Sequence, residues 1–233
     1  MYNLDIETIE KLHSNIAKIE QIKSFKYSKE FLKLWHKRLL ETANTQTFFI
    51  SKFKDKSQCY EGTFNFYGVD ISLTFNIEYM LSMLSKNDNR LFTKIVLDND
   101  KGNLSYFSDK CIYTFYEENE IKEHYENYEN ILVVPIPIVP TQYIIVDGNH
   151  RVCKQIYDNK KTIEAYYSSE IISALSLIKP IQISVYCFLF DTAKIIYNYG
   201  KVKDGLIRNE LNIFNHNSAF YFSFNRKKID FST

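Results

Sequence analysis

Five consecutive residues in the second half of the chain have side chains, or the lack of one, that could support chemistry: Asp147, Gly148, Asn149, His150 and Arg151. An arginine carries a planar fork of N–H donors that matches the oxygens of a phosphate. A histidine donates a further hydrogen bond and can carry a proton near neutral pH. The aspartate would repel a phosphate, so three other roles are open: to hold Mg²⁺, to accept a hydroxyl proton, or to orient His150 or Arg151.

A strand and a helix must position these residues. The apolar run QYIIV, residues 142–146, predicts a buried strand, and RVCKQIYDN predicts a helix that begins at about Asn149 or His150. Gly148 permits a sharp turn and keeps a side chain away from a ligand. The first N–H groups of a helix have no partner within it, and the helix dipole adds partial positive charge there. Together these features predict an anion-binding site.

The motif resembles the phosphate-binding motif of the ParB/sulfiredoxin superfamily. Many members read D-G-x-H-R between a strand and a helix, as this chain does, and the resemblance covers roughly residues 131–190. It implies that a nucleotide, ATP or CTP with Mg²⁺, binds at the start of the helix. The residues implied are Gly148, Asn149, His150 and Arg151 for binding the nucleotide, Asp147 and His150 for catalysis, and Asp147 for the metal.

Two departures from the superfamily argue against particular activities. Sulfiredoxins place a nucleophilic cysteine between the glycine and the histidine, where this chain has Asn149; Cys153 lies one helical turn later. We therefore do not expect reduction of sulfinic acids. Partition proteins carry a helix-turn-helix module after the nucleotide-binding domain, and the sequence after Phe190 has no convincing one, so we do not expect a role in chromosome partition.

The catalytic partner of Asp147 stays open. A free-serine kinase branch of the superfamily couples the motif to an upstream glutamate that acts as a base. No spacing argument selects one acid in this chain. The candidates are Glu117, Glu118, Glu120, Glu164 and Asp191.

The rest of the chain predicts a mixed α+β fold. We expect a ParB/sulfiredoxin-like C-terminal half and an N-terminal half of helices and β-hairpins. A glutamate-rich stretch, residues 117–130, suggests domains at 1–120 and 121–233, unless the two form one continuous domain. Helices are predicted near residues 9–19, 28–40, 77–84, 169–179 and 191–200. The last of them is expected to begin at an Asp191 cap and to end at Gly200. Strands are predicted at 45–53, 61–75, 131–139, 162–169 and 181–190, and a hairpin at 93–107.

Composition limits the classes of protein that the chain can belong to. The net charge is +1, which does not favour a surface built mainly for duplex DNA. The N-terminus has no secretory signal, and no segment reaches the ~20 apolar residues of a membrane span. The four cysteines form no C-x-x-C pair, so we expect a cytoplasmic protein with reduced thiols and no membrane partner. Asp98 and Asp100 resemble the opening of a calcium loop, but a plain hairpin turn is favoured because Gly102 is fifth instead of sixth.

The sequence therefore predicts a nucleotide- or phosphate-binding protein that is a Mg²⁺-dependent, NTP-using enzyme, either a phosphotransferase or an NTP hydrolase. One alternative is a non-catalytic nucleotide- or DNA-binding regulatory module of a DNA-modification or phage-defence system. Another is a ParB-like nuclease, which ranks last because the sequence shows no paired carboxylates for two metal ions. The choice of nucleotide, the acceptor substrate, the role of residues 1–120 and the oligomeric state are left open by the sequence.

Overall fold

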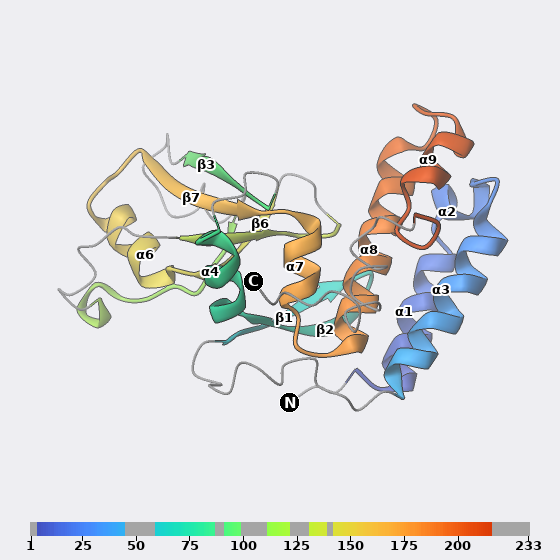
Figure 1. Cartoon of the computed structure of the whole chain (residues 1–233), viewed down its shortest axis with the longest axis horizontal. Helices are drawn as coiled ribbons and strands as arrows, with labels where there is room; N and C mark the ends of the chain where they lie inside the picture. The colour runs from blue at the N-terminus through green and yellow to red at the C-terminus, as the bar shows by residue number, and fades with distance from the viewer. Residues whose placement is uncertain are drawn as a thin grey trace. The chain divides into compact units, whose positions relative to one another are not determined.

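The computed structural model describes residues 4–44, 59–86, 91–98, 111–121, 131–138 and 142–215. Figure 1 shows the helices and strands of the chain, coloured from the N-terminus to the C-terminus. The contacts between residues divide the chain into two compact units. Unit 1 comprises Met1–Asn76 and Ala174–Thr233, and unit 2 comprises Ile77–Ser173. The boundary expected at residue 120 falls inside unit 2, so the division by contacts differs from the division suggested by composition.

Unit 1 is a group of helices with one β-hairpin. Its elements are α1 (Ile6–Ala17), α2 (Glu20–Ser24), α3 (Ser28–Ala43), β1 (Cys59–Phe66), β2 (Val69–Asn76), α8 (Pro180–Asn198) and α9 (Asp204–Glu210). Asp5 caps α1, because its carboxylate accepts the N–H of Thr8 at 2.8 Å. The core forms where α1, α3 and α8 meet, and there the ring of Phe188 contacts the rings of Phe31 and Trp35.

The hairpin of β1 and β2 closes on a two-residue turn. Tyr67 and Gly68 both have positive φ, 51° and 76°, which matches the tight turn that suits the twist of paired strands. Asn15 of α1 donates its amide N–H to the Tyr67 carbonyl at 2.9 Å. This bond supports an uncommon backbone conformation for a tyrosine and ties the hairpin to α1.

Helix α8 corrects the strand predicted at residues 181–190. The segment is helical throughout, and every side chain from Ile181 to Leu189 is buried. A helix that is buried on all sides has no polar stripe, so its periodicity is lost and a run of β-branched and aromatic residues resembles a strand. The helix start was signalled by Pro180, which occupies the first turn. Asp191 lies inside this helix and is not the cap of a new one, whereas Gly200, with φ 71°, follows its end as expected.

Unit 2 is built on a five-stranded mixed sheet in the order β3-β7-β5-β6-β4. The β5–β6 and β3–β7 pairs are antiparallel, and the β5–β7 and β4–β6 pairs are parallel. Its elements are α4 (Ile77–Leu84), β3 (Phe92–Asp98), β4 (Cys111–Ile112), the 3₁₀ helix η2 (Glu118–Glu120), β5 (Leu132–Pro135), β6 (Tyr143–Asp147), α6 (Asn149–Tyr157), β7 (Thr162–Ser168) and α7 (Glu170–Ser176), which crosses the boundary between the units.

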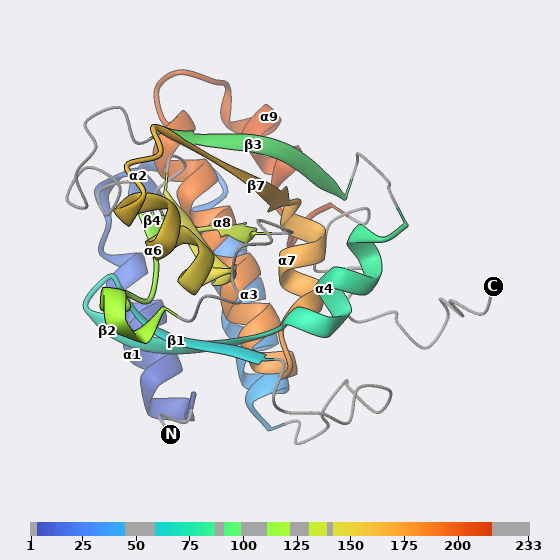
Figure 2. The same ribbon diagram turned by 90° about the vertical axis from the view of Figure 1, so that its left-hand side faces the viewer.

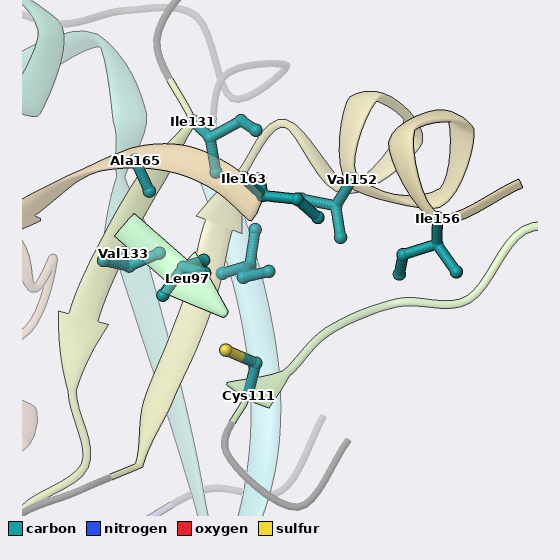
Figure 3. Packing of buried hydrophobic residues seen from close by; sticks show 9 residues of the cluster. Leu97, Cys111, Ile131, Val133, Val152, Ile156, Ile163 and Ala165 are labelled. Carbon is teal, nitrogen blue, oxygen red and sulfur yellow. The ribbon is translucent and has the colours of Figure 1, made fainter. Parts of the chain in front are cut away.

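Helix α6 covers one face of this sheet, and Figure 2 views the molecule from the side of α6. Val152 and Ile156 of α6 belong to one buried cluster with Ile163 of β7, and the Val152 side chain points toward Ile163 (Figure 3). The other members of the cluster come from the strands and the residue before β5: Leu97, Cys111, Ile131, Val133, Ile145 and Ala165. Burying each large aliphatic side chain contributes roughly 1.5–3 kcal/mol, so this cluster fixes α6 against the sheet.

The mixed α+β class is confirmed by both units. The predicted strand and helix on either side of Gly148 are β6 and α6, and the proline-rich run contributes β5, which lies inside the sheet with Pro135 as its last residue. The strand predicted at residues 45–53, the calcium-like loop after Asp98 and most of the glutamate-rich stretch lie outside the described residues. Asp98 itself is the last residue of β3. Within the described part of the chain, no helix is both long enough and apolar enough to cross a membrane.

Candidate phosphate-binding site at the start of α6

Gly148 joins β6 to α6 in the way that the sequence predicts. It is the N-cap of α6, with φ 90° and ψ 19°, a left-handed conformation that glycine adopts without steric cost. The first hydrogen bond within the helix runs from the Val152 N–H to the Gly148 carbonyl, at 2.9 Å. Because glycine has no side chain, the N-cap residue makes no side-chain hydrogen bond to the first turn.

The surroundings of Gly148 also require a glycine. A Cβ atom there would lie 2.9 Å from Cγ1 of Ile131 and 3.2 Å from both Nε and Nη2 of Arg151. The 2.9 Å distance to Ile131 is shorter than any ordinary contact between carbon atoms. The 3.2 Å distances show that the Arg151 side chain folds back toward Gly148, so that its guanidinium lies beside the first turn of α6.

Asp147 holds Arg151 in this position. Asp147 Oδ2 accepts a hydrogen bond from Arg151 Nη2 at 3.0 Å, and both side chains are largely withdrawn from solvent, with 29% and 16% of their areas exposed. This pairing is the one that an orienting role of Asp147 requires. The two other roles considered for Asp147, as a ligand of Mg²⁺ and as a proton acceptor, stay predictions.

Asn149 points away from the helix start and into the protein. Its side-chain amide donates to the Ile145 carbonyl at 3.2 Å, and its Oδ1 accepts the Thr114 N–H at 2.8 Å. The residue is 9% exposed. Its side chain therefore joins β6 to the segment after β4, and what it presents at the helix start is its backbone N–H.

Side chains on one face of α6 form hydrogen bonds with the backbone of residues 113–117, which lie along the helix. Asn149, Cys153 and Tyr157 are spaced four residues apart, so they share a face of the helix. Cys153 Sγ lies 3.7 Å from the Thr114 carbonyl, and the Tyr157 hydroxyl donates to the Tyr116 carbonyl at 3.4 Å. Burial raises the pKa of the Cys153 thiol, which is the direction expected of an unreactive, structural cysteine.

His150 lies against an aromatic ring that no sequence pattern indicates. The His150 imidazole stacks on Tyr116, with ring centroids 3.6 Å apart and planes inclined by 23°. Tyr116 and Thr114 lie more than 30 positions before the motif, and neither belongs to a recognisable pattern. Only the parallel pairing of β4 with β6 brings them to α6.

Most of the candidate catalytic acids already have hydrogen-bond or ion-pair partners. Glu117 and Glu120 form the capping box of η2: the Glu117 N–H donates to Oε2 of Glu120 at 2.8 Å, and the Glu117 side chain accepts the N–H of Glu120. Burial raises the pKa of the Tyr157 hydroxyl, and the charges of Glu117, Glu118 and Glu120 add to this effect.

The other two candidate acids already have partners. Glu164 pairs with Lys94 at 2.7 Å on the exposed face of the sheet. Asp191, in unit 1, is fully buried and accepts hydrogen bonds from Trp35 Nε1 and from the backbone N–H groups of Asn212 and Ile213. In the parts of the chain that the structure describes, no group of three or more His, Cys, Asp or Glu side chains gathers as a metal site would.

Comparisons with protein-family models, with curated proteins and with solved structures found no match for this chain. The resemblance of the motif to the ParB/sulfiredoxin superfamily therefore stays a prediction, and it rests on residues 147–151 and their strand–glycine–helix setting.

Proposed function

We propose that the start of α6 binds the phosphate of a nucleoside triphosphate such as ATP or CTP, and that the protein is a Mg²⁺-dependent enzyme, either a phosphotransferase or an NTP hydrolase. One observation carries the binding site: the guanidinium of Arg151 is folded over an uncapped helix start that has a glycine at its N-cap. The helix dipole, the first N–H groups and a fixed guanidinium all favour an anion at the same place.

The ion pair with Asp147 supports this site in two ways. It fixes the direction of a long side chain before the ligand arrives, so less conformational entropy is lost on binding. It also uses only one terminal nitrogen of the guanidinium, which carries five N–H donors in total. A phosphate can therefore be bound by Arg151 while Asp147 keeps hold of it.

Mg²⁺ fits the residues at the site on one condition. The ion is usually held by one or two carboxylates together with phosphate oxygens, and it would neutralise charge on the phosphates. Asp147 Oδ2 already accepts a hydrogen bond from Arg151, so Oδ1 would be the oxygen that meets the ion. The proposed role of His150 is to donate a hydrogen bond to the transferring phosphate, or to carry a proton, from a ring held by Tyr116.

A non-catalytic nucleotide-binding module is the second candidate, and the pairing of Asp147 favours it. Asp147 Oδ2 already accepts a hydrogen bond from Arg151 at 3.0 Å, so that oxygen is not free to accept a proton or to bind a metal ion. Of the candidate upstream glutamates, Glu117 and Glu120 are engaged with each other in the capping box of η2. Such a protein would bind the nucleotide and release it unchanged.

A thermal-shift experiment tests the binding site. ATP, ADP, CTP and GTP are added with and without Mg²⁺, and a ligand that binds only the folded protein raises the apparent melting temperature. We expect a shift with at least one triphosphate, and its loss in Arg151→Ala. Lys154→Ala is the matched control, because Lys154 lies on the same helix and pairs with Asp158 at its C-terminal end. No shift with any nucleotide at millimolar concentration would contradict the site.

Measurement of product separates the two candidate functions. Inorganic phosphate and nucleoside diphosphate are followed with wild-type protein and with Asp147→Asn. The enzyme predicts turnover that needs Mg²⁺ and is lost in Asp147→Asn. The binding module predicts a thermal shift without product in any variant.

A further inference from the structure

The turn between α8 and α9 concentrates apolar side chains at the surface. Eight large hydrophobic side chains are exposed in the described part of the chain, and half of them lie within the ten residues 197–206. They are Tyr197, Tyr199, Val202 and Leu206, with 59%, 41%, 38% and 56% of their areas exposed. Scattered exposed apolar residues are ordinary, but a local concentration marks an interaction surface. We call residues 197–206 the tyrosine–lysine turn.

Positive charge accompanies these side chains. Lys201 and Lys203 are exposed, and Lys201 Nζ lies 4.1 Å from the centre of the Tyr197 ring. The one acid of the turn, Asp204, is half-buried, and its carboxylate accepts the backbone N–H of Lys26 at 2.8 Å. The tyrosine–lysine turn therefore presents apolar groups and lysine ammonium groups together.

The flanking residues keep this positive balance. Between Lys194 and Glu210 the chain has four basic residues and two acidic ones. Arg208 is paired with Glu30 and lies over the ring of Phe214, so it stabilises α9 rather than the exposed surface. The excess charge at the turn comes from its lysines.

We infer that the tyrosine–lysine turn binds the surface of an anionic lipid bilayer. Lysines near such a surface are attracted by its negative potential, tyrosine rings favour the headgroup region, and aliphatic side chains enter the boundary with the acyl chains. A single-stranded nucleic acid would also attract the lysines and stack on the rings, but it offers nothing to Val202 and Leu206. Binding to a surface requires no membrane-spanning segment, so it is compatible with the absence of a spanning helix among the described residues. The inference departs from the sequence-based expectation of no membrane partner, which considered membrane-spanning segments alone.

Sedimentation with lipid vesicles tests the inference. Wild-type protein is mixed with vesicles of phosphatidylcholine alone and of phosphatidylcholine with phosphatidylserine. We expect binding to the second kind, and weakening by added salt because exposed charges are screened. The double variant Lys201→Gln, Lys203→Gln should weaken partitioning about fivefold for each lysine removed. Leu206→Ser should weaken partitioning by about fivefold as well, because less apolar surface is buried in the membrane.

Matched controls come from α1 in the same unit. Lys11→Gln with Lys18→Gln removes two exposed lysines elsewhere, and Ile6→Ser removes an exposed side chain that has 48% of its area in solvent and lies between Asp5 and Glu7. Neither should change binding to vesicles.

Four results would overturn the inference. The first is no sedimentation with phosphatidylserine vesicles, and the second is an equal loss of binding in the controls. The third is a single-stranded oligonucleotide that binds through Lys201 and Lys203 while Leu206→Ser has no effect, which would assign the turn to nucleic acid. A dimer in analytical ultracentrifugation that Leu206→Ser dissociates would likewise replace the lipid surface with a second copy of the chain.

Discussion

Replacing Gly148 by alanine tests the geometry on which the candidate site depends. Gly148 has φ 90° and lies against Ile131 and Arg151. Gly200 provides a matched control, because its φ is 71° and a Cβ there would meet no atom within 4 Å. Gly148→Ala therefore introduces backbone strain and a collision, whereas Gly200→Ala introduces strain alone.

The magnitudes follow from these two terms. A left-handed conformation costs a residue with a Cβ about 1–2 kcal/mol. An alanine restricts the unfolded chain and returns about 0.4–1 kcal/mol. Gly200→Ala should thus lower the free energy of unfolding by about 1 kcal/mol. At Gly148 the Cβ would also lie 2.9 Å from Ile131 Cγ1, and overpacking of this kind costs about 1–3 kcal/mol, so we expect a total near 2–4 kcal/mol.

The assay is urea unfolding of both variants, followed by far-ultraviolet circular dichroism. Trp35 is the only tryptophan and lies in unit 1, so its fluorescence reports that unit separately if the two units unfold in different transitions. The same Cβ would push the Arg151 guanidinium away from its 3.2 Å position, so nucleotide-induced thermal shifts should fall in Gly148→Ala as well. If Gly148→Ala is no more destabilising than Gly200→Ala, the close approach of Ile131 to this turn is wrong.

Three further predictions concern other parts of the structure. Asp191→Ala removes the acceptor of three hydrogen bonds, two of them buried, and should cost about 3 kcal/mol or more, measured by urea unfolding with Trp35 fluorescence. A loss under about 1 kcal/mol would contradict the hydrogen bonds described for this carboxylate. Burial lowers the pKa of His13 in the folded protein, so the unfolded chain binds a proton at a higher pH than the folded protein does. The free energy of unfolding should therefore decrease as the pH falls below about 6.5. His13→Gln should make the free energy of unfolding depend less on pH in that range, measured by urea unfolding at a series of pH values. Asn149→Ala removes the acceptor of the Thr114 N–H and should speed exchange of that amide about tenfold in hydrogen-exchange measurements, while an unchanged rate would place the hydrogen bond elsewhere.

The local geometry of the site could be predicted from the sequence because it depends on neighbouring residues. A buried strand, a glycine and an amphipathic helix in succession leave few conformations, and Gly148 adopts the one expected. The contacts of Asn149 and His150 could not be predicted, because their partners Thr114 and Tyr116 are distant in sequence and reach α6 only through the pairing of β4 with β6. Tertiary contacts of this kind leave no local pattern.

The prediction for residues 181–190 was wrong for a different physical reason. Strand and helix are distinguished by the period of polar and apolar residues, and a fully buried segment has no such period. The local signals that remained pointed in opposite directions: β-branched and aromatic residues favoured a strand, and Pro180 followed by a long apolar run favoured a helix start. Asp191 added to the error, because a buried aspartate with three hydrogen bonds has the same sequence signature as an N-cap.

The contacts that the side chains of α6 already make show where a ligand can bind on this helix. Val152 and Ile156 are used by the core, and Asn149, Cys153 and Tyr157 are used by residues 113–117. The side of the helix that remains carries Lys154, which pairs with Asp158. Among the described surroundings of α6, the helix start combines a glycine N-cap with a guanidinium that is already oriented, so an anion bound to α6 should bind there and should not disturb the packing of the helix. It follows that Arg151→Ala should abolish nucleotide binding while unit 2 stays folded, although the loss of its ion pair with Asp147 lowers the free energy of unfolding. A variant in which unit 2 unfolds would show that the guanidinium belongs to the scaffold and not to the site.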